Sequence, residues 1–166
     1  MFIAKKLEDC VIESVVDGSG FRIVLFTSGC PHHCKGCHNI DTWNMKNGVE
    51  YSVKEIADYL SNLYIKGNGF FQGFTFSGGD PLYQSDELLE LILLLKENLK
   101  EFKFDIWTYT GYLYEDVKDL EVLKHIDYLM DGKFIEEERV FPVKPFRGSN
   151  NQRLLELKEG KILSVS

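Results

Sequence analysis

Short β-rich runs alternate with helical patterns along most of this chain, and this alternation limits the folds that it can adopt. The runs lie at residues 22–28, 73–77, 104–109 and 127–130. Strands that alternate with helices form βα units, in which neighbouring strands are parallel and crossovers are right-handed. With 166 residues, 44% of them hydrophobic, the chain can bury one core. The sequence predicts an α/β fold, a single-domain partial (βα) barrel with mostly parallel strands.

The helices between these runs have local boundary signals. Ser52 followed by Glu55 is a capping-box pattern, and Gly67 follows the last residue at helical spacing. Ser85 is expected to cap the next helix, because acidic residues fill the turn after it. A further helix is expected near 115–125.

The last third of the chain has a weaker pattern. The tail at 135–166 recovers regular spacing only near its end, where Glu159 and Gly160 could turn a short hairpin. We find no internal repeat, low-complexity tract or linker. One domain over residues 1–166 is therefore expected.

Each predicted strand ends in glycine-rich or polar sequence. A cysteine loop at 29–43 follows the first, and SGGDP (77–81), TYTG (108–111) and DGK (131–133) follow the others. In barrels and open α/β sheets alike, chemistry collects at the carboxyl ends of the strands. The four segments are therefore expected to form one site.

Charge and hydropathy disfavour several classes of partner. A net charge of -7 disfavours a broad electrostatic contact with nucleic acid or with an anionic membrane. The amino terminus is charged where a signal peptide would be apolar, and the longest apolar stretch, from Leu88, is too short to span a bilayer. We expect a cytoplasmic protein. Thiols stay reduced there, so closely spaced cysteines indicate metal or redox chemistry.

Three cysteines, Cys30, Cys34 and Cys37, give the spacing C-x3-C-x2-C. Closed zinc sites and ordinary iron-sulfur sites use four protein ligands, so three thiolates leave one metal position open. Two alternatives stay in view: a zinc site completed by His38, and three unliganded thiols. Cys10 stands alone on an apolar segment and is expected to be a small buried hydrophobe.

The segment VDGSGFRIVLFTSGCPHHCKGCHNIDTW, residues 16–43, resembles the amino terminus of the radical S-adenosylmethionine glycyl-radical-enzyme activases. The likeness includes the DG-x-G-x-R segment, the cysteine spacing, the HN-x-DTW that follows, and SGGDP further on. It implies a fold of the radical S-adenosylmethionine type. It also implies an oxidoreductase with a 4Fe-4S cluster held by Cys30, Cys34 and Cys37, in which S-adenosylmethionine completes the fourth iron.

In this family, reductive cleavage of S-adenosylmethionine at the cluster yields methionine and a 5'-deoxyadenosyl radical, which takes a hydrogen atom from a glycine of the partner. The resemblance implies cofactor contacts at the cysteine loop and at the other three strand ends. The residues expected to bind the cofactor are Gly36, Cys37, His38, Gly78, Gly79, Asp80, Thr108, Asp131 and Lys133. No protein acid or base is required, since cluster and cofactor supply the chemistry.

Several of these residues also have simpler interpretations. Asp80 could cap a Gly-Gly turn rather than hold the cofactor ammonium. Many family members carry Glu at this position, so the shorter acid implies an altered contact. Asp131 and Lys133 resemble a pair near the cofactor carboxylate, but two charged residues at a strand end are also typical of a solvated turn. Thr108, Tyr109 and Thr110 are candidates for the ribose pocket.

The segment RGSNNQR at 147–153, together with MDGKF at 130–134, resembles the activating proteins of anaerobic ribonucleoside-triphosphate reductases. That likeness implies a partner, the large reductase subunit with a glycine in its carboxyl-terminal loop, and an electron donor of the flavodoxin or ferredoxin type. Arg147 and Arg153 could guide the partner, or the segment could be a polar surface loop. The alternatives are a pyruvate formate-lyase-type or other activase, and a non-catalytic zinc-binding module.

Overall fold

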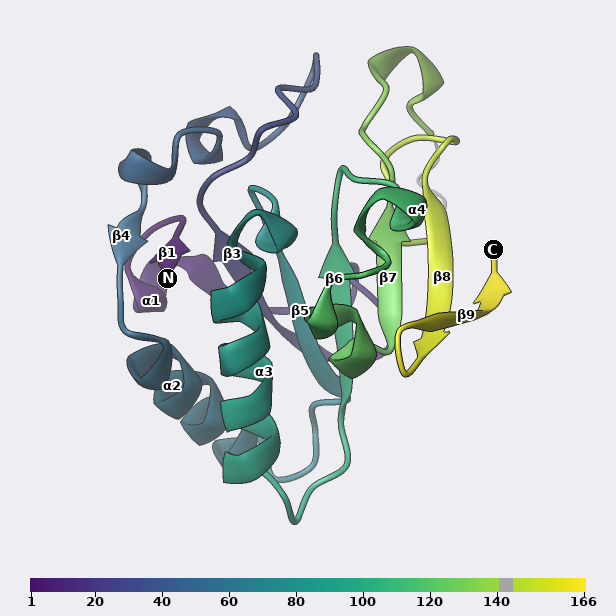
Figure 1. Cartoon of the computed structure of the whole chain (residues 1–166). Helices are drawn as coiled ribbons and strands as arrows, with labels where there is room; N and C mark the ends of the chain where they lie inside the picture. Colours follow the sequence, from purple (N-terminus) through teal and green to yellow (C-terminus); the bar gives the residue numbers. More distant parts are fainter. Residues whose placement is uncertain (141–144) are drawn as a thin grey trace.

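The computed structural model describes residues 1–140 and 145–166 (Figure 1). Within them a nine-stranded mixed sheet forms the centre of the molecule. Its strands are β1 Phe2–Ile3, β2 Val11–Ser14, β3 Arg22–Thr27, β4 Val49–Glu50, β5 Gly73–Gly78, β6 Asp105–Tyr109, β7 Tyr128–Asp131, β8 Arg153–Lys158 and β9 Lys161–Val165. The strand order is β4-β1-β3-β5-β6-β7-β8-β9, and β2 pairs with β3.

The four predicted strands form the parallel centre of this sheet. β3, β5, β6 and β7 pair in parallel, so that Val24 lies beside Thr75, and Thr75 beside Trp107. The margins are antiparallel, with β1, β2 and β4 on one side and the β8–β9 hairpin on the other. The predicted α/β class and parallel centre are confirmed, but the sheet as a whole is mixed because the strands at its margins run antiparallel to their neighbours.

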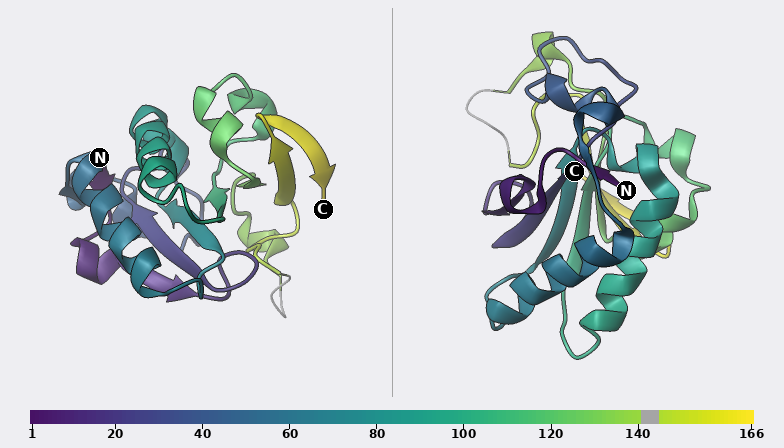
Figure 2. Two further views of the ribbon diagram at one scale, coloured as in Figure 1. Left: turned by 90° about the horizontal axis from the view of Figure 1, so that it is seen from below. Right: turned by 90° about the vertical axis from the view of Figure 1, so that its left-hand side faces the viewer.

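The two long helices, α2 Val53–Lys66 and α3 Ser85–Asn98, cover one face of the sheet (Figure 2). The shorter elements are α1 Leu7–Cys10, α4 Tyr114–Val117 and the 3-10 turns η1 Ile40–Thr42, η2 Met45–Asn47, η3 Pro81–Gln84, η4 Glu121–His125 and η5 Glu136–Glu138. Figure 2 shows α2 and α3 lying side by side against the sheet. Ile56, Leu60 and Leu91 pack there on Phe74 and Phe76, all of them buried. No helix in the described ranges is long and apolar enough to cross a membrane.

Two helix predictions need correction. The N-cap of α3 is Gln84 rather than Ser85, because η3 runs directly into α3 and is itself capped by the Asp80 carboxylate, which accepts from the Leu82 N–H. The helix expected at 115–125 is two short turns, α4 and η4. Leu120 interrupts it, because its backbone is extended and its side chain packs on the core.

The predicted hairpin and capping box are both present. Glu159 and Gly160 have positive φ angles and join β8 to β9. Ser52 Oγ accepts a hydrogen bond of 3.2 Å from the Glu55 N–H, and Glu55 Oε2 accepts one of 2.9 Å from the Ser52 N–H. Together these bonds satisfy two backbone donors at the start of α2.

Replacing Ser52 with alanine is expected to destabilise the protein by about 1 kcal/mol, because the first turn of α2 loses its side-chain acceptor. For a chain of this size, that loss lowers the melting temperature by roughly 2–4 °C, measurable by circular dichroism. Ser164→Ala on the exposed strand β9 is the control, and we expect little change from it. Equal melting temperatures for wild type and S52A would contradict the capping role.

The opposite face of the sheet holds a buried charge. Arg22, whose side chain is 0% exposed, pairs with Asp105 at 2.5 Å and donates hydrogen bonds to Thr75 Oγ1 and to the Phe74 carbonyl. The Arg22 guanidinium also lies 5.3 Å from the centre of the Trp107 ring. This cluster ties β3, β5 and β6 together from the side away from α2 and α3.

Candidate functional site

The carboxyl ends of the parallel strands meet around a cavity of about 280 Å³. The loop after β3 contributes Cys30, Cys34 and Cys37. The lining also includes Gly78 and Gly79 at the end of β5, Tyr109, Thr110 and Gly111 at the end of β6, and Gly132 after β7. The four strand ends therefore converge on one site, as the sequence predicts for neighbouring parallel strands.

Backbone hydrogen bonds close the base of the cysteine loop. The Gly29 N–H donates to the Thr42 carbonyl at 2.7 Å, and the Cys30 N–H donates to the Trp43 carbonyl at 3.0 Å. Within the loop, the Cys37 N–H donates to the Cys34 carbonyl at 3.1 Å. The segment that carries the cysteines is therefore a loop between β3 and η1 whose base is closed by backbone hydrogen bonds.

The three loop cysteines are half-buried free thiols that face one cavity. Burial raises the pKa of Cys30 and of Cys34 above the usual value, and a backbone hydrogen bond lowers it in part. Metal ligation requires thiolates, so loading this site with metal must release protons. The Asn39 N–H already donates to Cys37 Sγ at 3.3 Å, a contact of the kind that tunes iron-sulfur centres.

The donor set, three thiols around one cavity, is compatible with an iron-sulfur cluster. The thiolates of a 4Fe-4S cluster bind different iron atoms, so they lie farther apart than the ligands of one zinc ion. Three soft sulfur donors suit the irons of such a cluster.

Gly78 and Gly79 have a packing role in addition to lining the cavity. A Cβ atom at Gly79 would lie 2.5 Å from the Gly29 carbonyl oxygen, and one at Gly78 would lie 2.5 Å from the Thr27 nitrogen. Gly78 also has a φ of 104°, a conformation that favours glycine. These glycines let the end of β5 approach the cysteine loop, and Asn39 strengthens the contact through a 3.3 Å hydrogen bond to the Gly78 carbonyl.

Asp80 lies behind the cavity wall and does not line it. Its side chain is buried and accepts hydrogen bonds from the Leu82 N–H, the Thr110 hydroxyl and the Gly111 N–H, at 2.9–3.0 Å. His32 Nε2 lies 2.6 Å from Asp80 Oδ2. This placement does not support the predicted contact between Asp80 and a cofactor ammonium, and it agrees with the simpler interpretation of a capping acid.

Thr108 also lies away from the cavity. Successive side chains of a strand point to opposite faces, and Thr108 lies on the same face as Ile106, which packs in the helix-covered core. Thr108 is buried and its hydroxyl has no partner among the described residues. Of the three candidates at this strand end, Tyr109 and Thr110 line the cavity and Thr108 does not.

Asp131 and Lys133 do not act as a pair. Asp131 is buried, where it accepts from the Tyr114 N–H at 2.8 Å and from Arg153 Nε at 2.9 Å. Lys133 is exposed and lines a neighbouring cavity of about 400 Å³, which shares His32, Gly111 and Gly132 with the first. Asp131 is therefore held by groups of the fold and Lys133 lies at the rim, and the contacts of both with the cofactor stay predictions.

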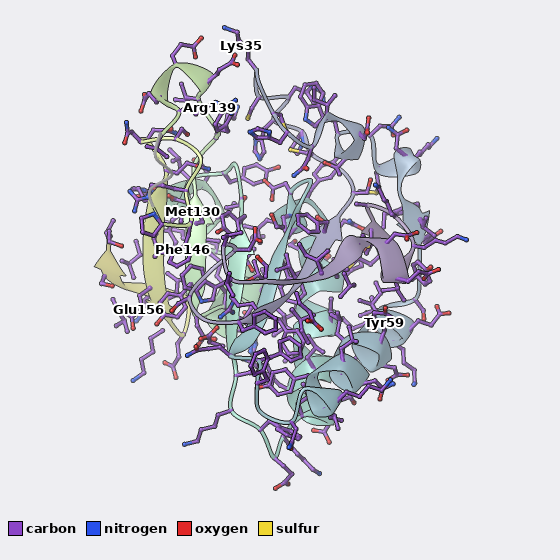
Figure 3. All side chains as sticks on the ribbon, turned by 180° about the vertical axis from the view of Figure 1, so that it is seen from behind. Lys35, Tyr59, Met130, Arg139, Phe146 and Glu156 are labelled. Carbon is purple, nitrogen blue, oxygen red and sulfur yellow. The ribbon has the colours of Figure 1, made fainter. Side chains whose placement is uncertain are left out.

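The tip of the cysteine loop contacts the loop after β7. Gly36, with a φ of 74°, packs on Glu136 and does not line the cavity, and its contact with the cofactor stays a prediction. Lys35 Nζ lies 2.9 Å from Glu137 Oε1, and Arg139 Nη1 lies 3.1 Å from Nε2 of the cavity-lining His38. Figure 3 shows Lys35 and Arg139 together at this end of the molecule.

The segment 147–153 contributes residues that sequence reasoning did not assign to the site. Gln152 lines the cavity and donates to the Gly132 carbonyl at 3.0 Å, and Asn151 donates to the Lys133 carbonyl at 2.8 Å. The segment is therefore fastened across the DGK turn. Arg153 is held by Asp131 and Glu115, so it serves the fold at this strand end.

Comparison with known proteins decides the family. Residues 16–155 match the model of the 4Fe-4S single cluster domain. The anaerobic ribonucleoside-triphosphate reductase-activating protein of Enterobacteria phage T4 is 45% identical, over 87% of this chain and 90% of its own length. The chain belongs to the family of anaerobic ribonucleoside-triphosphate reductase-activating proteins. Relatives with the same name in Vibrio cholerae and Escherichia coli K12 are 40% and 34% identical, each over 83% of this chain and over 89% and 90% of their own lengths.

Family membership settles several predictions. The likeness of the chain to the reductase-activating proteins, the enzyme class and the 4Fe-4S cofactor are confirmed. The segment from 16 to 43, which carries the first resemblance, lies within the matched domain. The residue-level assignments around the cofactor rest on the geometry described above.

Proposed function

We propose that this chain activates an anaerobic ribonucleoside-triphosphate reductase by generating a glycyl radical on the large reductase subunit. The observation that carries the proposal is the placement of Cys30, Cys34 and Cys37 around one cavity at the ends of parallel strands. The names of the similar proteins supply the partner.

In this proposal, the three thiolates hold a 4Fe-4S cluster and leave one iron open to S-adenosylmethionine. When bound and reduced, the cluster supplies the electron for cleavage of the cofactor, which initiates hydrogen removal from the partner's glycine. Residues of the chain line and close the cavity that would hold the cluster and the cofactor. Gly78 and Gly79 present backbone to it, Tyr109 and Thr110 form the wall at the end of β6, and Gln152 closes the side next to β7.

The proposal also covers the domain architecture, the electron donor and the cellular compartment of the reaction. Residues 1–166 work as one radical S-adenosylmethionine domain, and the sheet acts as a partial (βα) barrel with this cavity at the carboxyl edge. The electron comes from a flavodoxin or ferredoxin-type donor. The reaction takes place in the reducing cytoplasm, where the four cysteines, all free thiols here, stay reduced.

The test is radical transfer to a defined partner. The anaerobically reconstituted protein, a chemical reductant and S-adenosylmethionine are mixed with the large reductase subunit, and electron paramagnetic resonance is recorded. We expect a glycyl radical signal that is lost when the acceptor glycine is replaced with alanine. A pyruvate formate-lyase replaces the reductase in a parallel sample. A radical on the lyase but not on the reductase would favour the alternative activase.

A further inference from the structure

His32 lies midway between two cluster ligands and points toward a neighbouring strand end. Its side chain is 6% exposed, although residues on both sides of it in the loop are exposed. Its ring meets the Tyr112 ring edge to face, with centroids 4.5 Å apart. Gly111 packs so tightly on the imidazole that a Cβ atom there would lie 2.3 Å from His32 Cδ2. The ring therefore fills a fitted slot.

The polar contact of His32 inside this slot is Asp80. Nε2 of the imidazole lies 2.6 Å from Asp80 Oδ2, and in the tautomer that carries its proton on Nε2 the ring donates a hydrogen bond to this oxygen. The other contacts of Asp80 come from Leu82, Thr110 and Gly111. One buried carboxylate thus connects the cysteine loop to the segments that follow β5 and β6.

We propose that His32 is a positioning residue, whose hydrogen bond to Asp80 fixes the spacing of Cys30 and Cys34 and so controls how firmly the chain holds its cluster. The inference rests on the cluster site of the proposed function. It assigns Asp80 to the support of the metal ligands. Groups that orient metal ligands commonly change metal affinity about 10–100-fold when they are removed.

The test compares two substitutions at one position. His32→Phe keeps a ring in the slot but removes the donor, whereas His32→Gln places an amide donor at a similar reach. Each reconstituted variant is exposed to an iron chelator without oxygen, at a temperature where circular dichroism shows it folded, and the loss of the cluster absorption is timed. We expect H32F to lose iron at least about tenfold faster than wild type, and H32Q to recover most of the difference.

Two further variants serve as a control and as an independent test of the positioning role. His33→Asn removes the adjacent imidazole, which faces Trp43 at 4.7 Å instead of Asp80, and asparagine tolerates the φ of 49° at this position. It is expected to retain iron as wild type does. Gly111→Ala leaves every hydrogen-bonding group in place but pushes the His32 ring, so it should accelerate iron loss even if H32F does not fold.

The outcomes separate this inference from the proposed function. Fast loss in H32F and G111A, with slow loss in H32Q and H33N, supports the positioning role. Wild-type rates in folded H32F and G111A, or equally fast loss in H33N, would overturn it while leaving the cluster site intact. A wild-type protein that binds no iron-sulfur cluster at all would instead contradict the proposed function.

Discussion

Alanine at Cys30, Cys34 or Cys37 is expected to abolish cluster binding, whereas alanine at Cys10 leaves it unchanged. The loop cysteines are free, half-buried and share one cavity, so each removal takes away one of three protein ligands. Cys10 is 3% exposed in the hydrophobic core, and its thiol donates to the Lys5 carbonyl. Iron and acid-labile sulfide are measured after anaerobic reconstitution.

The wild type and C10A are expected to carry about four irons per chain, and each loop variant only a small fraction of that. Because the loop is pinned by backbone bonds at Gly29 and Cys30, the single variants should stay folded without the cluster. A loop variant that retains the full iron and sulfide content would show that the corresponding cysteine is not a ligand.

Replacing Arg22 with methionine is expected to destabilise the protein by about 3 kcal/mol, the lower end of the cost of removing one partner of a buried ion pair, because the Asp105 side chain is 27% exposed. Methionine preserves much of the apolar stem but leaves Asp105 without its 2.5 Å partner and Thr75 without its donor. Chemical denaturation of the cluster-free protein measures the free energy of unfolding. The double variant R22M/D105N is expected to recover part of the loss, since no unpaired charge remains.

The loss in R22M is also expected to depend on pH. Burial raises the pKa of Asp105, and the charge of Arg22 lowers it in part, so removing Arg22 raises the folded pKa further. The folded state then holds the Asp105 proton more tightly than the unfolded chain does, and the penalty is relieved as pH falls through the folded pKa. R22M should therefore lose less stability at about pH 5 than at about pH 8. An equal loss at both would exclude a charge effect.

The sequence predicted the parallel strands and their convergence because these features depend on backbone periodicity. The runs at 22–28, 73–77 and 104–109 are long enough to show a β pattern, and the observed β3, β5 and β6 each differ from them by one residue at one end. The strands β1 and β4 have two residues each, too few for any pattern. They form because their partners in the sheet satisfy their backbone groups.

The direction in which a side chain points was harder to predict from the sequence than the position of its residue at a strand end. Thr108 and Tyr109 are neighbours in TYTG, but strand alternation sends only Tyr109 to the cavity, and the parity of a short strand is set by packing on distant residues. Asp80 follows a strand end as expected, yet its carboxylate turns inward because His32, Thr110 and Gly111 surround it. Gln152 reaches the site from far along the chain, and RGSNNQR was the signal that could have found it.

The most direct test of the central claim is electron paramagnetic resonance of the reduced, reconstituted protein, recorded with and without S-adenosylmethionine. If three thiolates leave one iron open to the cofactor, a reduced 4Fe-4S signal will appear and will change shape when S-adenosylmethionine is added. A colourless protein that holds one tightly bound zinc ion and gives no such signal would contradict the account.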